Sequence, residues 1–249
     1  MDNQRTRIAI VGATSSIAEH CARIWAGSRN LDLTLVCRDG PKAERMAADL
    51  RVRCPGSAVQ VVEADFLDPT AVHRLVHDLT AQGPIDIALI AHGYLPDQLR
   101  CQEELTATHH ALVINGISPV LFAEAFANHM ARINHGTLCI IGSVAGDRGR
   151  RSNYVYGAAK GLITRYAQGL QHRLANTNVK VVLVKPGPTA TPMTAHMNQR
   201  GMASAADVAQ CVVDGIGKGK PLVYAPAKWG PIMMAIRHLP GLIFNRMNI

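Results

Sequence analysis

Short apolar runs alternate along the whole chain with longer segments in which apolar positions recur every three or four residues. The short runs are rich in Val, Ile and Leu, which predicts strands separated by helices. Strands of such nearly continuous apolar character are typical of a parallel sheet covered by helices on both faces. The pattern therefore predicts an α/β fold with a doubly wound, seven-stranded and mostly parallel sheet. The predicted strands are Ile8 to Val11, Leu31 to Cys37, Ala58 to Glu63, Ile85 to Ala91, Gly136 to Ile141, Val179 to Lys185 and Leu222 to Tyr224.

The chain has 249 residues, of which 48% are hydrophobic, enough to bury one large core. No internal repeat, low-complexity tract or Pro/Ser-rich linker interrupts the alternation, so we expect a single domain over residues 1–249. Two segments depart from the pattern. Thr189 to Gly201 is polar and follows the sixth strand, and we expect it to be a mobile excursion able to close over a substrate. Residues 226–249 are predicted to form a C-terminal helical extension.

The start of the sequence lacks the charged segment and long apolar run of a signal peptide, and the chain contains no uninterrupted apolar stretch of about 18 residues. We therefore expect a cytoplasmic protein. Its six cysteines are scattered, without a Cys-x-x-Cys pair. His73 and His77 have the spacing of metal ligands, but Arg74 stands where a zinc protease needs its glutamate, so no metal site is expected.

Tyr156 and Lys160 lie four residues apart in a segment of helical periodicity, so that their side chains share one helix face. A nearby ammonium group stabilises a phenolate, and we expect Lys160 to lower the pKa of Tyr156 toward neutrality. Ser143 ends the fifth predicted strand, where its hydroxyl can bind a substrate oxygen. With Asn115, these residues form a candidate set for proton transfer to or from an alcohol or ketone.

In type and order, Asn115, Ser143, Tyr156 and Lys160 resemble the catalytic residues of the short-chain dehydrogenase/reductase family, and the likeness covers nearly the whole chain. The resemblance implies a Rossmann-type fold and hydride transfer between a nicotinamide cofactor and a carbonyl or alcohol carbon. Tyr156 would donate the proton, Lys160 would contact the cofactor ribose, and Asn115 would connect Lys160 to water. A homodimer or homotetramer is also implied.

The first strand runs into a loop that precedes a helix, a place where backbone amides and the positive helix end can hold a pyrophosphate. This cofactor loop contains Gly12, Thr14, Ser15, Ser16 and Ile17. The family usually has three glycines here, whereas this chain retains only Gly12 and has other small residues at the second and third positions. Small residues still permit a close approach of the cofactor.

Arg38 follows the second strand, and Cys37 stands where members of the family that prefer NAD usually have an aspartate. A guanidinium at this place can bind the 2′-phosphate of NADP, so we predict NADP(H) as the cofactor. Asp39 keeps NAD(H) as an open alternative.

Three further segments match cofactor-binding parts of the family. Asp65 and Phe66 correspond to its adenine-contacting pair, and Ala91-His92-Gly93 stands where Asn-Ala-Gly is usual. The residues expected beside the nicotinamide carboxamide are Pro186, Gly187, Thr189 and Thr191.

Arg148, Arg150 and Arg151 lie between the predicted catalytic serine and tyrosine. Arginine binds phosphate and carboxylate groups through two parallel hydrogen bonds, so the cluster predicts an anionic substrate. A solvated loop is the alternative interpretation.

The C-terminal part of the chain is basic and apolar, since no acidic residue follows Asp214 and the formal net charge is +8 at pH 7. Pro231, Pro240 and Gly241 interrupt its apolar positions, so that it cannot span a bilayer but could lie on the inner face of a membrane. Packing against the sheet edge or another subunit is the alternative. Nucleic acid is not an expected partner, because the tail is apolar and carries no recognisable motif.

Several local runs resemble one branch of the family, the decaprenylphosphoryl-2-keto-pentose reductases. That resemblance implies reduction of a keto-sugar carried on a polyprenyl phosphate, with a separate flavin-dependent oxidase forming the ketone. A soluble ketone, an acyl-thioester or a hydroxy-lipid is the alternative substrate, and a non-catalytic sensor of NADP(H) is the remote alternative. The matching runs are 149–157, 193–196, 218–220, 223–227, 233–234 and 237–240.

Overall fold

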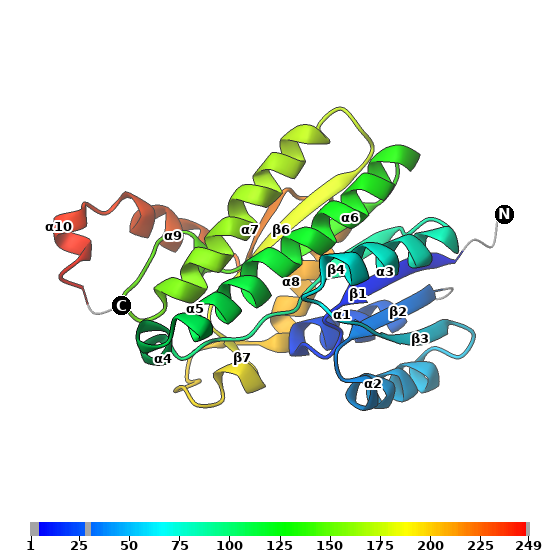
Figure 1. Ribbon diagram of the computed structural model, residues 1–249, viewed down its shortest axis with the longest axis horizontal. Helices are drawn as coiled ribbons and strands as arrows, with labels where there is room; N and C mark the ends of the chain where they lie inside the picture. The colour runs from blue at the N-terminus through cyan, green and yellow to red at the C-terminus, as the bar shows by residue number, and fades with distance from the viewer. Residues whose placement is uncertain (1–4, 28–30, 248–249) are drawn as a thin grey trace.

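The computed structural model describes residues 5–27 and 31–247 and contains a seven-stranded sheet with helices on both faces (Figure 1). The strand order is β3-β2-β1-β4-β5-β6-β9, and all neighbouring strands are parallel. The strands are β1 (Thr6–Val11), β2 (Leu31–Cys37), β3 (Ala58–Glu63), β4 (Ile87–Ile90), β5 (Thr137–Ile141), β6 (Lys180–Pro186) and β9 (Leu222–Ala225).

Helices cover the sheet in two layers. One layer contains α1 (Ser16–Ala26), α2 (Gly40–Arg53) and α8 (Ala205–Gly217). The other contains α3 (Pro69–Ala81), α6 (Ser118–Ile133) and α7 (Tyr154–Arg173). The remaining helices are α4 (Gln98–Glu103), α5 (Leu105–Leu112), α9 (Trp229–His238) and α10 (Gly241–Phe244), together with a π-helical turn at Val113–Ile117 and 3-10 turns at Val144–Gly146 and Pro192–Thr194.

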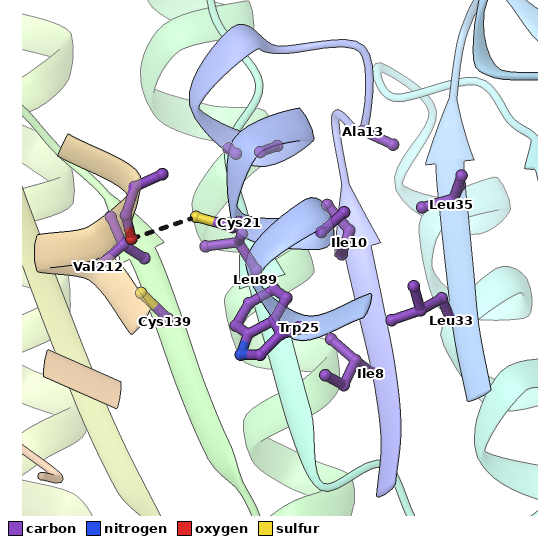
Figure 2. Close-up of a cluster of buried hydrophobic side chains, with 14 of the residues drawn as sticks. Ile8, Ile10, Ala13, Cys21, Trp25, Leu33, Leu35, Leu89, Cys139 and Val212 are labelled. Atoms are coloured by element: carbon purple, nitrogen blue, oxygen red, sulfur yellow. Dashed lines mark hydrogen bonds between the residues drawn. The ribbon is translucent and has the colours of Figure 1, made fainter. Parts of the chain in front are cut away.

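The two layers exist because successive residues of a strand point to opposite faces of the sheet. In β1, Ile8 and Ile10 pack beneath α1, and Ala9 and Val11 pack on the other face. Figure 2 shows the first of these cores, in which Trp25 of α1 lies over the strands. The strands inside the sheet are therefore buried on both sides, which is the physical reason for their apolar runs, whereas the edge strand β3 alternates between buried and exposed positions.

The seven predicted strands are all present, and those of β2 and β3 have the predicted bounds. The segment after β6 is more ordered than its polar composition suggests. Its two-residue strand β7 (Thr189–Ala190) pairs with β8 (Ala203–Ser204), and the Thr194 hydroxyl donates a hydrogen bond to the carbonyl of Thr189 (2.7 Å). Whether this segment closes over a substrate stays a prediction.

The continuous helical stretch Leu105–Ile133 is apolar enough, by length and composition, to cross a membrane. More than half of its most apolar window is buried inside the molecule, and Phe122, Phe126 and Met130 belong to the core. This stretch is therefore a core helix of the fold.

The helical extension predicted for residues 226–249 is present up to residue 247, and its last two residues lie outside the described part of the chain. Helices α9 and α10 project at the end of the molecule opposite to the start of β1 (Figure 1). Only Met233 is buried in α9, and no residue is buried in α10.

Candidate active site

A cavity of about 580 Å³ opens at the carboxyl ends of the strands. It is lined by residues that follow β1, β2, β4, β5 and β6, and by the start of α7. The strand order reverses between β1 and β4, which is the place where doubly wound sheets bind dinucleotides. All four predicted catalytic residues lie in or beside this cavity.

The loop after β1 forms one end of the cavity, with Thr14, Ser15, Ser16 and Ile17 among its lining residues. Gly12 has a φ of 80°, and a Cβ placed on it would lie 2.6 Å from Cβ of His92. Only glycine fits here, because the backbone is left-handed and the loop after β4 is too close for a side chain. The loop delivers the chain to the N-terminus of α1, whose free amides fit a pyrophosphate.

Arg38 and Lys42 line the same end of the cavity, and both are exposed. Lys42 escaped the sequence prediction because it lies in a helix, one turn beyond the residue that the motif identifies. Asp39, which kept NAD open as an alternative, does not line the cavity. Its carboxylate accepts a hydrogen bond from the backbone N–H of Lys42 (2.9 Å) and caps α2. Two cations and no lining carboxylate suit a 2′-phosphate.

The residues predicted near adenine differ in their position relative to the cavity. Phe66, Ala91, His92 and Gly93 line the cavity, whereas Asp65 does not. The carboxylate of Asp65 is exposed and accepts a hydrogen bond from the backbone N–H of Leu67 (2.8 Å), forming a local turn. A contact between Asp65 and adenine stays a prediction.

His92 stands where the family usually has alanine, and its ring packs against core residues. Its ring packs edge-on against Phe66 and Phe122, and its Nε2 lies 2.9 Å from the Ser118 hydroxyl. Burial, reinforced by the charges of Lys160 and Arg38, lowers the pKa of His92 to about 3. The imidazole is therefore neutral at physiological pH.

Ser143 is positioned by a tight turn between β5 and α7. Its hydroxyl accepts a hydrogen bond from the backbone N–H of Ala145 (3.1 Å). The turn packs directly on α7, because a Cβ on Gly146 would lie 2.5 Å from the carbonyl carbon of Lys160, and a Cβ on Gly157 would lie 2.9 Å from the Ala145 oxygen. These two glycines bring Ser143 to the helix that carries Tyr156.

Tyr156 and Lys160 lie on the same side of α7, as the four-residue spacing predicts, and both line the cavity. The electrostatic prediction was wrong in this structure. Burial raises the pKa of Tyr156 to about 12, and a hydrogen bond with Ser143 opposes that rise. Lys160 Nζ lies 5.7 Å from the centre of the Tyr156 ring and donates a hydrogen bond to the Ile141 carbonyl (3.1 Å), while burial lowers the pKa of Lys160 to about 8.

Asn115 is fully buried in the π-helical turn that joins α5 to α6. Its side-chain oxygen accepts a hydrogen bond from the backbone N–H of Tyr94 (2.8 Å), and its amide donates one to the Ala111 carbonyl (3.0 Å). A Cβ on Gly93 would lie 2.8 Å from that oxygen and 3.6 Å from Lys160 Nζ. Asn115 therefore holds the loop after β4 beside Lys160, and π-helical turns often mark functional sites.

The segment after β6 forms another part of the cavity wall. The predicted residues Pro186, Gly187, Thr189 and Thr191 all line the cavity. Sequence reasoning missed the apolar wall beyond them, because methionines in an irregular segment carry no motif. That wall contains Met193, Met197 and Met202, with Leu95 from the loop after β4.

The three arginines predicted to bind substrate have different positions. Arg150 lines the cavity, but Arg148 and Arg151 do not. The Arg148 guanidinium donates hydrogen bonds to the carbonyls of Ile236 and Leu239 (both 2.6 Å), so it anchors the C-terminal extension. The sequence could not distinguish these arginines, because all three lie in one loop. Their difference arises only when the C-terminal tail folds back onto Arg148. Ser152 and Asn153 line the cavity beside Arg150.

Comparisons with known proteins agree with this geometry. The family model of the short-chain dehydrogenases matches residues 6–201. The chain is 30% identical to an uncharacterized oxidoreductase from Streptomyces coelicolor, over 97% of this chain and 96% of the relative. It is 32% identical to another from Mycobacterium tuberculosis strain H37Rv, over 99% of this chain and 98% of that relative.

Solved structures show the same fold. A short-chain dehydrogenase from Sphingobium yanoikuyae in complex with NADPH has a TM-score of 0.82 at 23% identity, covering 98% of this chain and 97% of that one. Another from Burkholderia cenocepacia J2315 in complex with NADP has a TM-score of 0.83 at 18% identity, covering 100% of both chains. From its sequence match and its fold, the chain belongs to the short-chain dehydrogenase/reductase family of oxidoreductases.

Proposed function

We propose that the protein uses NADPH to reduce a ketone to a secondary alcohol. The observation that carries this proposal is the meeting of Ser143, Tyr156 and Lys160 at one end of a cavity whose other end has Arg38 and Lys42. The distal cations suit a 2′-phosphate, and the proximal hydroxyls suit a carbonyl oxygen. The structural neighbours complexed with NADPH and NADP support the same choice of cofactor.

In the proposed reduction, each residue of the site has a separate role. A bound nicotinamide would supply the hydride to the carbonyl carbon. Ser143 and Tyr156 would hold the carbonyl oxygen between their hydroxyls. Because the pKa of Tyr156 is about 12, its hydroxyl is protonated at neutral pH and can donate a proton to the developing alkoxide. Lys160, with a pKa of about 8, is close enough to neutrality to return a proton to the site.

For the substrate, the proposal is a keto-sugar carried on a polyprenyl phosphate. The cavity has a polar wall of Arg150, Ser152 and Asn153, and an apolar wall that includes Met193 and Met197. An amphipathic substrate with an anionic group and a long apolar chain fits both walls. Its ketone would arise by oxidation of a sugar hydroxyl, the role expected of an upstream flavin-dependent oxidase. The protein would then work at the cytoplasmic face of the inner membrane.

The chemistry is tested by Tyr156→Phe, with Tyr154→Phe as the matched control two residues away on an exposed site of α7. Loss of the proton donor should reduce kcat by at least about 100-fold, the usual minimum for a general acid. NADPH affinity, measured by fluorescence titration, should change little in either variant. Near-normal turnover by Tyr156→Phe would contradict the proposal.

The substrate is tested by giving the wild-type enzyme NADPH and either a polyprenyl-phosphoryl keto-pentose or a soluble ketone. The proposal expects a much higher kcat/KM for the lipid-linked ketone. A higher kcat/KM for soluble ketones, acyl-thioesters or hydroxy-lipids would favour those alternatives. Binding of NADPH without turnover of any of them would favour a sensor of NADP(H).

A further inference from the structure

The C-terminal arm, residues 229–247, carries several large apolar side chains that are exposed to solvent. Met234 is 60% exposed, Leu242 is 82% exposed and Ile243 is 53% exposed. All three lie on helices that project from the molecule (Figure 1). Apolar residues gathered on a projecting element indicate a contact surface, whereas isolated exposed apolar residues do not.

The arm is firmly joined to the catalytic end of the molecule. Arg148, five residues after Ser143, donates hydrogen bonds to carbonyls near the end of α9, and its guanidinium lies 3.8 Å from the centre of the Phe244 ring. At the start of α9, the Trp229 indole occupies the space above Gly187, where a Cβ would lie 1.9 Å from its nitrogen. Gly187 lines the cavity, so the arm begins at the cavity wall.

The positive charge of the arm and of the residues beside it indicates what kind of partner the arm binds. Lys228, Arg237 and Arg246 are exposed, and the sequence has no Asp or Glu after Asp214. Apolar side chains among cations suit an interface of anionic lipid headgroups. A symmetric contact between two arms would instead bring like charges together. The charge therefore favours a lipid surface over a second copy of the same arm.

We propose that the C-terminal arm docks the protein on an anionic lipid surface, with Leu242 and Ile243 inserted into the interface. The arm starts at the cavity wall and is held by Arg148 of the serine turn, the loop from Ser143 to Arg148. Docking therefore brings the cavity close to the lipid. Met193 and Met197, which line the cavity and are partly exposed, lie on the segment that follows Gly187. The docking itself does not depend on the identity of the substrate.

Sedimentation of the full-length protein with vesicles tests this proposal without using enzymatic activity. Wild type should sediment with vesicles of phosphatidylcholine mixed with phosphatidylglycerol, much less with phosphatidylcholine alone, and less as salt is raised. Replacing both Leu242→Asp and Ile243→Asp should weaken partitioning about tenfold or more. The matched control is Val52→Asp on α2, at a residue that is 79% exposed and far from the arm in sequence, and it should bind like wild type.

Thermal unfolding of the variants shows whether each is folded. The proposal is overturned if folded wild type stays in the supernatant with anionic vesicles, or if the double variant sediments as well as wild type. Light scattering, which measures the size of the oligomer, distinguishes lipid binding from binding of a second copy of the chain. If wild type is a larger oligomer than the double variant and does not sediment, the arm binds a second copy instead.

Discussion

The guanidinium of Arg150 reaches the cavity without an ion-pair partner among the described residues. Burial lowers the pKa of Arg150, but arginine stays charged at physiological pH. A partly buried cation without a carboxylate has a strong tendency to bind an anion. Arg150 is therefore the residue at which an anionic substrate group would gain most.

Replacing Arg150 with alanine should raise KM for an anionic ketone roughly 10–100-fold, because a charge-assisted hydrogen bond contributes about 1.5–3 kcal/mol. The kcat should change little, since the interaction is made equally in the ground and transition states. Steady-state kinetics with an anionic and an uncharged ketone provide the measurement. Arg151→Ala, outside the cavity, is the control; an equal rise in KM for both variants would contradict the assignment.

Single residues also show how far sequence reasoning can reach. The spacing of Tyr156 and Lys160 predicts a shared helix face, because helical geometry is local. The direction of their pKa shifts was not predictable, because burial depends on which elements close over α7. The role of Arg148 was not predictable for the same reason. Its hydrogen-bond partners, the carbonyls of Ile236 and Leu239, are distant in the sequence and are brought beside Arg148 only by the fold.

At the scale of elements, a buried ion pair ties the serine turn to the sheet. Lys185 near the end of β6 bonds Asp147, and the Tyr224 hydroxyl of β9 donates a hydrogen bond to the same carboxylate (2.8 Å). Both charged side chains are almost completely buried. This network joins the turn after β5 to β6 and β9, next to Arg148, which holds the C-terminal arm, and no sequence motif marks it.

Replacing Asp147 with asparagine should lower the free energy of unfolding by about 3–5 kcal/mol, because Lys185 would be left as an unpaired buried charge. The double variant Asp147→Asn with Lys185→Met should recover much of that loss. Urea unfolding measures both. The exposed pair Arg100–Glu104 is the control, and Glu104→Ala there should cost less than about 1 kcal/mol. A double variant no more stable than the single one would refute the pairing argument.

The periodic elements and the irregular ones differ in how well they could be predicted. β2 and β3 have their predicted bounds. β2 is buried along nearly its whole length and β3 alternates between buried and exposed residues, and both patterns can be recognised in a short stretch of sequence. The π-helical turn around Asn115 and the β7–β8 pair were missed. Both are shorter than the window in which periodicity is measurable, and both depend on contacts distant in sequence.

At the scale of the whole molecule, the cavity extends along the carboxyl edge of the sheet, with two cations in one part and the candidate catalytic hydroxyls in another. Arg38 follows β2 and Lys42 lies on α2, on one side of the strand-order reversal, and Ser143 and Tyr156 lie on the other side. Only an extended ligand can reach both groups. In the function that we propose, cofactor selection and chemistry therefore belong to different parts of the chain.

Replacing Arg38 and Lys42 together with alanine should weaken NADPH binding roughly 10–100-fold, through loss of charge-assisted hydrogen bonds to the 2′-phosphate. NADH binding should stay near its original value, because NADH lacks that phosphate. Fluorescence titration with the two cofactors gives the ratio of affinities. Arg45→Ala, on the same helix but outside the cavity, should leave the ratio unchanged. An unaltered ratio in the double variant would assign cofactor selection to other residues.

The sequence by itself determined the order of strands and helices, the family, and the four candidate catalytic residues, because hydrophobic periodicity and short-range spacing are local properties of the chain. Only the tertiary structure decided which charges face the cavity, which are buried in pairs and which hold the tail. It separated Arg150 from Arg148, brought Lys42 beside Arg38, and raised rather than lowered the pKa of Tyr156. These outcomes depend on burial and long-range contacts, since the energy of a charge is set by everything folded around it.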